Sequence, residues 1–204
     1  TGTASDLVIP GSYSIVDGQY VEGNDYTVTE IGDGAVSGLS SLISVTIPSC
    51  IQSIGDNAFT QNEYLETVKF IGNSQLTTIG EGAFAECFEI NELHIPASVV
   101  TIERYAFSNT NLEVLEFNEG SQLESIGMEA FAFALISEVT IPASVTYLGV
   151  GAFGDCRNLS SVTFENTTGW QDGTTTLSSS DLSNRTTAAT YLTNTYANRE
   201  WTRS

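Results

Sequence analysis

Apolar residues return along this chain in a fixed order and at a nearly fixed interval. Each interval holds a triplet with the spacing Leu-x-x-Val-x-Ile, and the residue between its last two members is polar or charged. Side chains two apart share one face of a strand, so each triplet predicts one short β-strand with a buried inner face and a solvated outer face. The six triplets are Leu42/Val45/Ile47, Leu65/Val68/Phe70, Ile90/Leu93/Ile95, Leu112/Leu115/Phe117, Ile136/Val139/Ile141 and Leu159/Val162/Phe164.

An Ala-Phe pair recurs between the triplets, four residues after an aliphatic residue that is usually followed by glycine. The pairs are Ala35-Val36, Ala58-Phe59, Ala83-Phe84, Ala106-Phe107, Ala130-Phe131 and Ala152-Phe153, spaced by 22 to 25 residues. The glycine suits a tight corner with a permissive backbone. We expect Ala-Phe to form a turn or a single helical loop that places the aromatic ring in the interior.

One such interval cannot fold alone. Ordering about 23 residues costs roughly 1.5 kcal/mol per residue, whereas about six buried side chains return roughly 1.5–3 kcal/mol each. A period of 20 to 50 residues is typical of a solenoid, in which neighbouring turns cover one another and their strands pair in parallel. The sequence therefore predicts a stack of about six turns, mostly β, with short turns or helical loops.

The turns also alternate in length. After Ile47, Ile95 and Ile141 the next aliphatic residue comes 7 residues later, and after Phe70 and Phe117 it comes 9 later. The structural unit is therefore a pair of turns, with a longer corner at every second layer.

The pattern Ile-Gly-x-x-Ala-Phe, followed by Leu-x-x-Val-x-Ile-Pro-x-Ser, resembles the BspA-like (Treponema pallidum-type) leucine-rich repeats over about residues 27–164. Val36 in place of Phe and Glu103 in place of Gly are departures. Residues 9–28 are similar to the hairpin that interrupts this family near its first turns, and residues 188–201 are similar to its C-terminal cap. The resemblance implies a leucine-rich-repeat solenoid in a secreted or surface-attached bacterial protein that binds host matrix proteins, other cells or polysaccharide.

The two ends are expected to cap the stack. From the apolar pattern, Leu7 to Val21 predicts a short hairpin, and Gly173 to Ser180 predicts a surface loop. Thr187 to Ala197 predicts one amphipathic helix that lays Leu192 and Tyr196 on the exposed end of the stack. We interpret the chain as one domain with an N-terminal cap, six repeats and a C-terminal loop and helix, at residues 1–30, 31–164 and 165–204.

The chain is strongly acidic, with 25 Asp and Glu against 6 Lys and Arg and a net charge of −19. This argues against nucleic acid or an anionic membrane as a partner, and no apolar run is long enough to span a bilayer. The start at Thr1 without Met is typical of a processed or trimmed chain. We expect Cys87 and Cys156 to be buried fillers in equivalent positions, and Cys50 to be a partly exposed thiol.

His94, the single histidine, lies on the outer face of the predicted strands. Lys69 and Glu116 fall beside it on adjacent strands, Glu92 falls on its own strand, and Glu138 lies two turns further along. These five residues are our candidate binding site, on the presumed concave face. The pattern also fits, and more readily, a cross-strand charge ladder on a solvated sheet, worth a fraction of a kcal/mol per pair.

We expect no catalytic residue, metal site or cofactor. A Ser-His-Asp or Cys-His site needs His94 beside a nucleophile and an orienting acid, and zinc needs at least three ligands. Glu92 and Glu116 could approach as a glycosidase-like pair, but nothing on an open strand face would raise the pKa of either.

A second candidate surface follows the Ala-Phe pairs, where Tyr64, Phe88, Phe133 and Leu135 recur. It could be a contact for a protein or a dimer seam; the interpretation we favour is that Phe88 and Phe133 tuck into the solenoid as extra core. We expect a monomer, with a dimer as the alternative.

Of the functional hypotheses, a non-catalytic recognition or adhesion module comes first. Its partner would be a host or matrix protein or a glycan, bound outside the cell or at its surface. A structural spacer domain in a larger surface protein comes second, and an enzyme third.

Overall fold

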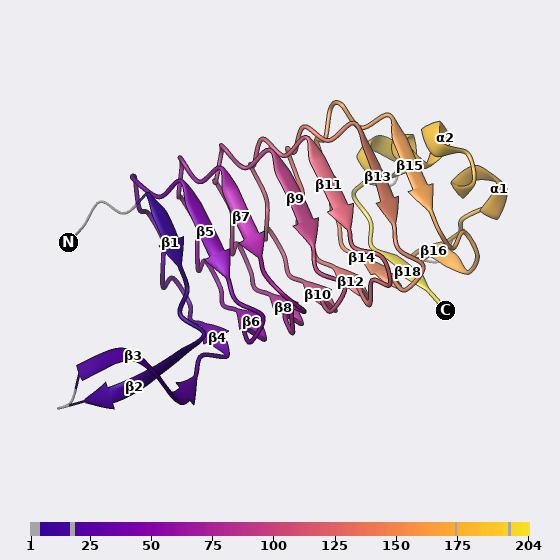
Figure 1. The fold of residues 1–204 in the computed structure, drawn as a ribbon. Coiled ribbons are helices and arrows are strands. Elements are labelled where there is room, and N and C mark those ends of the chain that lie inside the picture. The colour runs from indigo at the N-terminus through magenta and orange to yellow at the C-terminus, as the bar shows by residue number, and fades with distance from the viewer. Residues whose placement is uncertain (1–4, 17–18, 174, 196) are drawn as a thin grey trace.

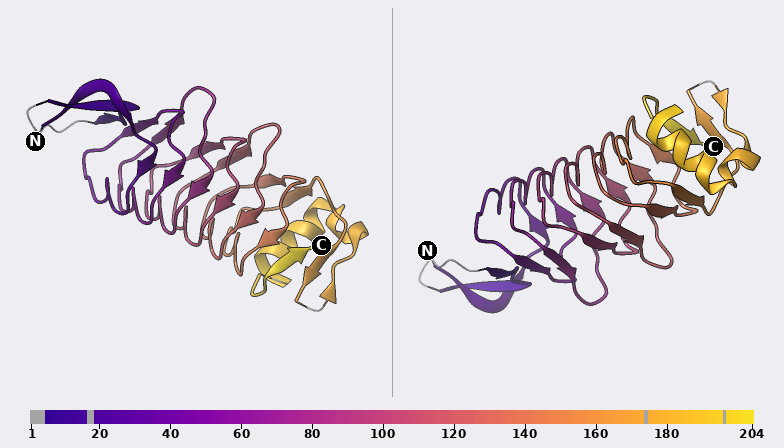
Figure 2. Two further views of the ribbon diagram at one scale, coloured as in Figure 1. Left: turned by 90° about the horizontal axis from the view of Figure 1, so that it is seen from below. Right: turned by 90° about the horizontal axis from the view of Figure 1, so that it is seen from above.

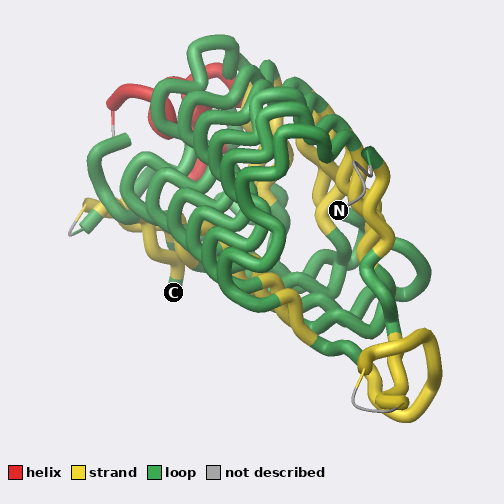
Figure 3. The backbone as a smooth tube through the Cα atoms, turned by 90° about the vertical axis from the view of Figure 1, so that its left-hand side faces the viewer, coloured by secondary structure: helices red, strands yellow, loops and turns green. Residues whose placement is uncertain are grey.

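Each repeat of the sequence folds into one coil, and the coils stack along a single axis (Figures 1 and 3). The computed structural model describes residues 5–16, 19–173, 175–195 and 197–204. A long strand occupies one side of each coil, at β1 (Asp6–Val8), β5 (Ser44–Ile47), β7 (Thr67–Phe70), β9 (Glu92–Ile95), β11 (Val114–Phe117), β13 (Glu138–Ile141) and β15 (Ser161–Phe164).

A short strand occupies a second side of each coil, so the prediction of one strand per repeat is wrong. The short strands are β4 (Glu30–Ile31), β6 (Ser53–Ile54), β8 (Thr78–Ile79), β10 (Thr101–Ile102), β12 (Ser125–Ile126) and β14 (Tyr147–Leu148). They end on the aliphatic residue that precedes the glycine, and a stretch of two residues is too short to show strand alternation in the sequence. They form an uninterrupted parallel ladder from β4 to β14.

The ladder of long strands, by contrast, is broken twice. Parallel pairing joins β1, β5 and β7, then β9 and β11, then β13 and β15, but neither β7 with β9 nor β11 with β13. The strands that pair do so in parallel, as predicted, and the ladder is interrupted at two places.

Both breaks follow a strand that ends in phenylalanine and leads into a longer corner. Phe70 and Phe117 end these strands and are half-buried, whereas Ile47, Ile95 and Ile141 in the other coils are fully buried. Two corners bulge from the stack, near residues 70–75 and 118–122 (Figure 2). We attribute the breaks to these corners, because extra residues need more room along the axis than the ~4.8 Å layer of a paired sheet provides.

The core is a column of stacked rings inside the coil. Phe59, Phe84, Phe107, Phe131 and Phe153 are fully buried, and successive ring centroids lie 4.9 to 5.4 Å apart with nearly parallel planes. Each ring therefore lies at the same place in its coil, as the period predicts. Ala and aliphatic residues of the triplets fill the space around the column.

At four of the five repeated glycines a Cβ would meet the backbone of the preceding coil, and only Gly32 has open space there. A Cβ on Gly80 would lie 2.7 Å from the carbonyl carbon of Gly55, and one on Gly127 would lie 2.5 Å from the Arg104 nitrogen. These glycines do not have positive φ. The expectation that this glycine provides a permissive backbone for a tight corner is therefore wrong: it allows two backbones to approach.

The N-terminal end differs from the predicted hairpin. Asp6–Val8 is a long strand of the stack, because β1 pairs in parallel with β5. The hairpin consists of β2 (Ser12–Val16) and β3 (Gln19–Thr27), inserted at a corner between β1 and β4, and it projects away from the coils (Figure 1).

The C-terminal end is closed by strands and helices. β18 (Trp201–Arg203) pairs antiparallel with β14 and with β16 (Trp170–Asp172), and Trp170 and Trp201 pack on Phe164. The segment predicted as a loop contains β17 (Thr175–Thr176), the buried Leu177 and α1 (Ser179–Leu182).

The expected amphipathic helix begins two residues earlier than predicted. It consists of α2 (Arg185–Thr190) and a π-helical continuation η1 (Tyr191–Thr195). Asn184 caps its start by accepting the N–H of Thr187. Leu192 is buried as predicted, and Tyr196 lies outside the described residues.

Candidate ligand-binding face

The long strands present one row of outward side chains, which we call the long-strand face. Side chains alternate along each long strand, so the apolar residues of the triplet point into the core and the residues between them point to solvent. The row is Ser44/Thr46, Thr67/Lys69, Glu92/His94, Val114/Glu116, Glu138/Thr140 and Ser161/Thr163. All five candidates from the sequence are exposed on this face: Lys69, Glu92, His94, Glu116 and Glu138.

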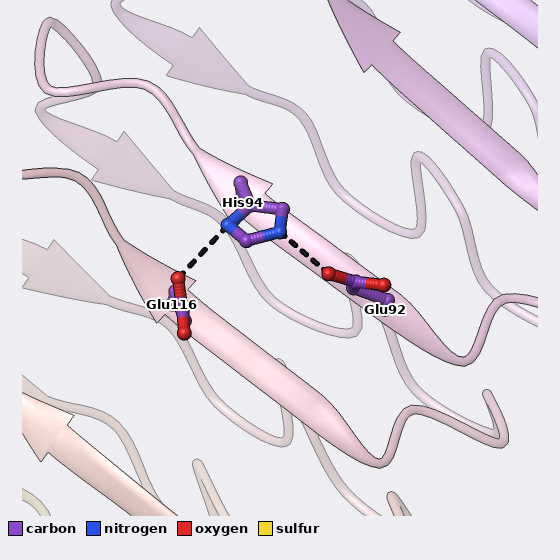
Figure 4. A network of polar contacts seen from close by, with 3 residues as sticks. All are labelled: Glu92, His94 and Glu116. Carbon is purple, nitrogen blue, oxygen red and sulfur yellow. Dashed lines mark hydrogen bonds and ion pairs between the residues drawn. The ribbon is translucent and has the colours of Figure 1, made fainter.

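Three of these five candidates form one contacting group (Figure 4). The Nε2 atom of His94 lies 2.8 Å from Glu92 Oε1, and its Nδ1 atom lies 3.0 Å from Glu116 Oε2. Pairing of β9 with β11 places His94 opposite Glu116. A neutral imidazole donates from only one nitrogen, so both contacts are made together only when the ring is protonated.

Lys69 does not join this group. Its strand β7 pairs with β5, where Lys69 stands opposite Thr46, and the first break separates β7 from β9. Among the described residues, no ion pair reaches Lys69. The predicted charge ladder is therefore confirmed from His94 to Glu116 and wrong from Lys69 to His94.

The second break opens a groove of about 530 Å³ on the long-strand face. β11 and β13 line its two sides, Ser161 and Thr163 of β15 extend it, and α2, which packs on β15, contributes Arg185. Glu116 and Glu138 both line this groove. Sequence reasoning missed the groove and Arg185; the longer corner after Phe117 was the signal that could have located it.

The aromatic candidates are exposed. Tyr64 is 55% exposed, Phe88 40%, Phe133 45% and Leu135 38%, so the favoured prediction that Phe88 and Phe133 enter the core is wrong. Phe133 and Leu135 share a coil, while Tyr64 and Phe88 belong to two successive coils nearer the N-terminus.

Phe133 also has an unfavourable backbone conformation. Its φ is +65°, in the left-handed region that bulky residues avoid. The equivalent position holds Gly38, Gln61, Glu86, Asn109 or Asp155 in the other coils, all with positive φ. The corner geometry of the coil imposes this φ, and phenylalanine adopts it at a cost.

The two buried thiols are held in the protonated form. Burial raises the pKa of Cys87 and of Cys156 to about 12. Their Sγ atoms lie 3.1 Å from the carbonyl oxygens of Phe59 and Phe131 in the preceding coils, so the thiols donate to them. Both are buried in equivalent positions as predicted, and Cys50 is a half-buried free cysteine.

Two further observations bear on the kind of site. Within residues 5–16, 19–173, 175–195 and 197–204, no group of three or more His, Cys, Asp or Glu could hold a metal ion. In the same ranges, no helix has both the length and the apolar character needed to cross a membrane.

The repeats can be compared with known families. A family model described as BspA type leucine rich repeat region (6 copies) matches residues 19–113 and again residues 69–174. The chain belongs to the BspA-type leucine-rich repeat family. A comparison with curated protein sequences found no significant match.

Solved structures of leucine-rich repeat proteins share the fold. The pneumococcal vaccine antigen PcpA is 32% identical over 79% of this chain, with a TM-score of 0.69, and the match spans 40% of PcpA. A Treponema pallidum leucine-rich repeat protein is 25% identical over 79% of this chain, with a TM-score of 0.52 and 59% of that protein covered. A leucine-rich cell surface protein from Faecalibacterium prausnitzii A2-165 is 24% identical over 86% of this chain, with a TM-score of 0.57 and 51% of that protein covered. This BspA-type chain therefore spans less than two thirds of each.

Proposed function

We propose that this chain is a non-catalytic recognition module of a bacterial secreted or cell-surface protein. It binds a host or matrix protein or a glycan through the long-strand face. Membership of the BspA-type family supports this, as does the similarity to a pneumococcal vaccine antigen and to a leucine-rich cell surface protein.

The observation that carries the proposal is the open groove within a row of exposed polar side chains. The stacked core fixes the backbone, and the outward side chains recur about every 4.8 Å along the axis wherever neighbouring long strands are paired. Such a surface is rigid before a ligand arrives, which reduces the entropy lost on binding.

The chemistry of the face favours binding over catalysis. Within the part of the chain that the structure describes, the polar contacts of His94 are with two carboxylates and not with a Ser, Thr or Cys that it could activate as a nucleophile. Cys87 and Cys156 are buried, and their raised pKa keeps them protonated at neutral pH.

The test is a binding array of immobilised matrix proteins and glycans. The wild-type chain is expected to bind at least one component, and Lys69→Ala/His94→Ala/Glu116→Ala is expected to lose that binding. The control is Glu63→Ala/Arg157→Ala, which also removes one residue of each charge, at exposed positions in the loops after Ala-Phe. A wild-type chain that binds nothing on a broad array would instead support a spacer domain.

A further inference from the structure

The gap between β11 and β13 leaves backbone groups of two strands without partners. In a parallel ladder, successive residues direct their N–H and C=O groups to opposite neighbours. Val114 and Asn118 donate toward β9. On the other side, Ser161 donates to Ser137, the residue before β13, and Glu165 donates to Ile141 at the end of β13. By alternation, the backbone groups of Leu115 and Phe117 face the gap from one side, and those of Glu138 and Thr140 face it from the other.

No backbone hydrogen bond joins these two strands within the described residues. The coils meet again at either end of the gap, where the Leu135 N–H donates to the Leu112 carbonyl and the Ser144 hydroxyl donates to the Ser121 carbonyl. The gap is thus a fixed opening between two anchored corners, and its carbonyl oxygens are available to a donor from outside.

The charge around the opening is one-sided. The groove is lined by one guanidinium, from Arg185, and by five carboxylates, from Glu113, Glu116, Glu119, Glu138 and Glu165. Glu116 contacts His94, and Glu165 accepts the N–H of Ala143. No cation among the described residues pairs with the other three.

The first break does not share this character. Lys69 lies on a strand beside it, so a cation is already present there. The two breaks have the same backbone origin and different charge, which makes the β11–β13 groove the one suited to a cationic group.

The groove also has an apolar part. Val114 is 42% exposed and Phe117 is half-buried, and both line it. Long basic side chains bury their methylene groups on such surfaces while the charged head stays with polar partners.

We propose that the β11–β13 groove binds an arginine side chain of an extended segment of a protein partner. The guanidinium has five N–H donors and no acceptor. It matches a site that offers carboxylates and open strand carbonyls. This inference rests on the proposed function and assigns the class of ligand.

The experiment is a titration of the ¹⁵N-labelled chain with the capped pentapeptide Gly-Gly-Arg-Gly-Gly, followed by NMR. The amides of Leu115, Phe117, Glu138 and Thr140 are expected to shift. The same peptide with Gln in place of Arg is expected to bind about tenfold more weakly, the effect of losing ~1.4 kcal/mol. Raising salt from 20 to 300 mM should weaken binding several-fold, since these charges are screened.

Glu113→Gln/Glu138→Gln should weaken the arginine peptide about tenfold. Glu63→Gln/Glu89→Gln removes the same charge from exposed loop positions and should leave binding within twofold. The NMR spectra report whether each variant is folded. Equal binding of the Arg and Gln peptides, or equal weakening by both double variants, would overturn the proposal.

The same NMR titration with a neutral glucan hexasaccharide tests whether the groove binds a glycan instead. If it shifts these amides and the arginine peptide does not, the groove is a glycan site and the inference fails. If a protein found on the array still binds Glu113→Gln/Glu138→Gln but not Lys69→Ala/His94→Ala/Glu116→Ala, the recognition function stands and the arginine site does not.

Discussion

Replacing Phe107 by alanine removes the middle one of the five stacked phenylalanine rings. Its centroid lies 5.2 Å from that of Phe84 and 5.4 Å from that of Phe131, with interplanar angles of 3° and 4°, and the side chain is fully buried. Truncating a buried Phe to Ala costs about 3–5 kcal/mol, and each stacked pair is worth about 0.5–1.5 kcal/mol beyond its buried area. We expect the free energy of unfolding to fall by about 4–5 kcal/mol, the upper part of the range, since two pairs are lost.

Phe59→Ala is the matched control. Among the residues that the structure describes, Phe59 stacks only on Phe84, because Val36 takes the phenylalanine position in the coil before it. We expect its cost to be smaller by about 1 kcal/mol, one aromatic pair.

Urea unfolding followed by far-ultraviolet circular dichroism measures both losses. The two tryptophans, at 170 and 201, lie in the C-terminal cap, so fluorescence shows whether the cap unfolds with the centre. A cost below 2 kcal/mol for Phe107→Ala, or a larger cost for Phe59→Ala, would show that the column does not hold the coils together.

Three further predictions concern corners and thiols. Phe133→Gly should raise the free energy of unfolding by about 1 kcal/mol, because glycine adopts φ of +65° without strain. A variant whose free energy of unfolding in urea does not exceed that of the wild type would contradict this. Gly127→Ala should lower the free energy of unfolding by more than ~2 kcal/mol, because the new Cβ would lie 2.5 Å from the Arg104 nitrogen and one coil would have to move. A loss below ~0.5 kcal/mol would refute the argument that the two backbones pack this closely. The pKa of Cys87 and of Cys156 is about 9 in the unfolded chain and about 12 in the folded chain, because burial disfavours the thiolate. Above pH 9 the unfolded state therefore loses these protons first. The free energy of unfolding should be unaffected below pH 9 and should fall from pH 9 to 12 by up to about 1.4 kcal/mol per pH unit for each thiol. Urea midpoints at pH 8 and 10.5 should show this decline, and Cys87→Ala/Cys156→Ala should reduce it; an equal decline in the double variant would assign it to other groups.

The periodic part of the fold was predictable because burial repeats with the coil. Leu93 and Ile95 recur at the strand period, and Phe107 recurs at the coil period, so inner face, stacking and parallel order followed from spacing alone. The short strands were missed because a two-residue strand such as Thr101–Ile102 is too short to show the alternation that marks a strand in the sequence.

The candidate site was only partly predictable. Glu92, His94 and Glu116 come together because they share a paired layer, whereas Lys69 is separated by a break that depends on corner length. Arg185 reaches the groove from the cap, where the repeat register no longer applies. Phe133 is exposed because the corner requires a left-handed residue at that position, a constraint of backbone geometry that hydrophobicity does not report.

Amide hydrogen exchange along β13 tests the opening of the long-strand face most directly. By alternation, the Val139 and Ile141 amides point to β15 and are hydrogen-bonded, whereas those of Glu138 and Thr140 point into the β11–β13 gap. We predict that the second pair exchanges about a hundredfold or more faster than the first. Equal protection of all four amides would mean that β11 and β13 are paired in solution and that the groove does not exist.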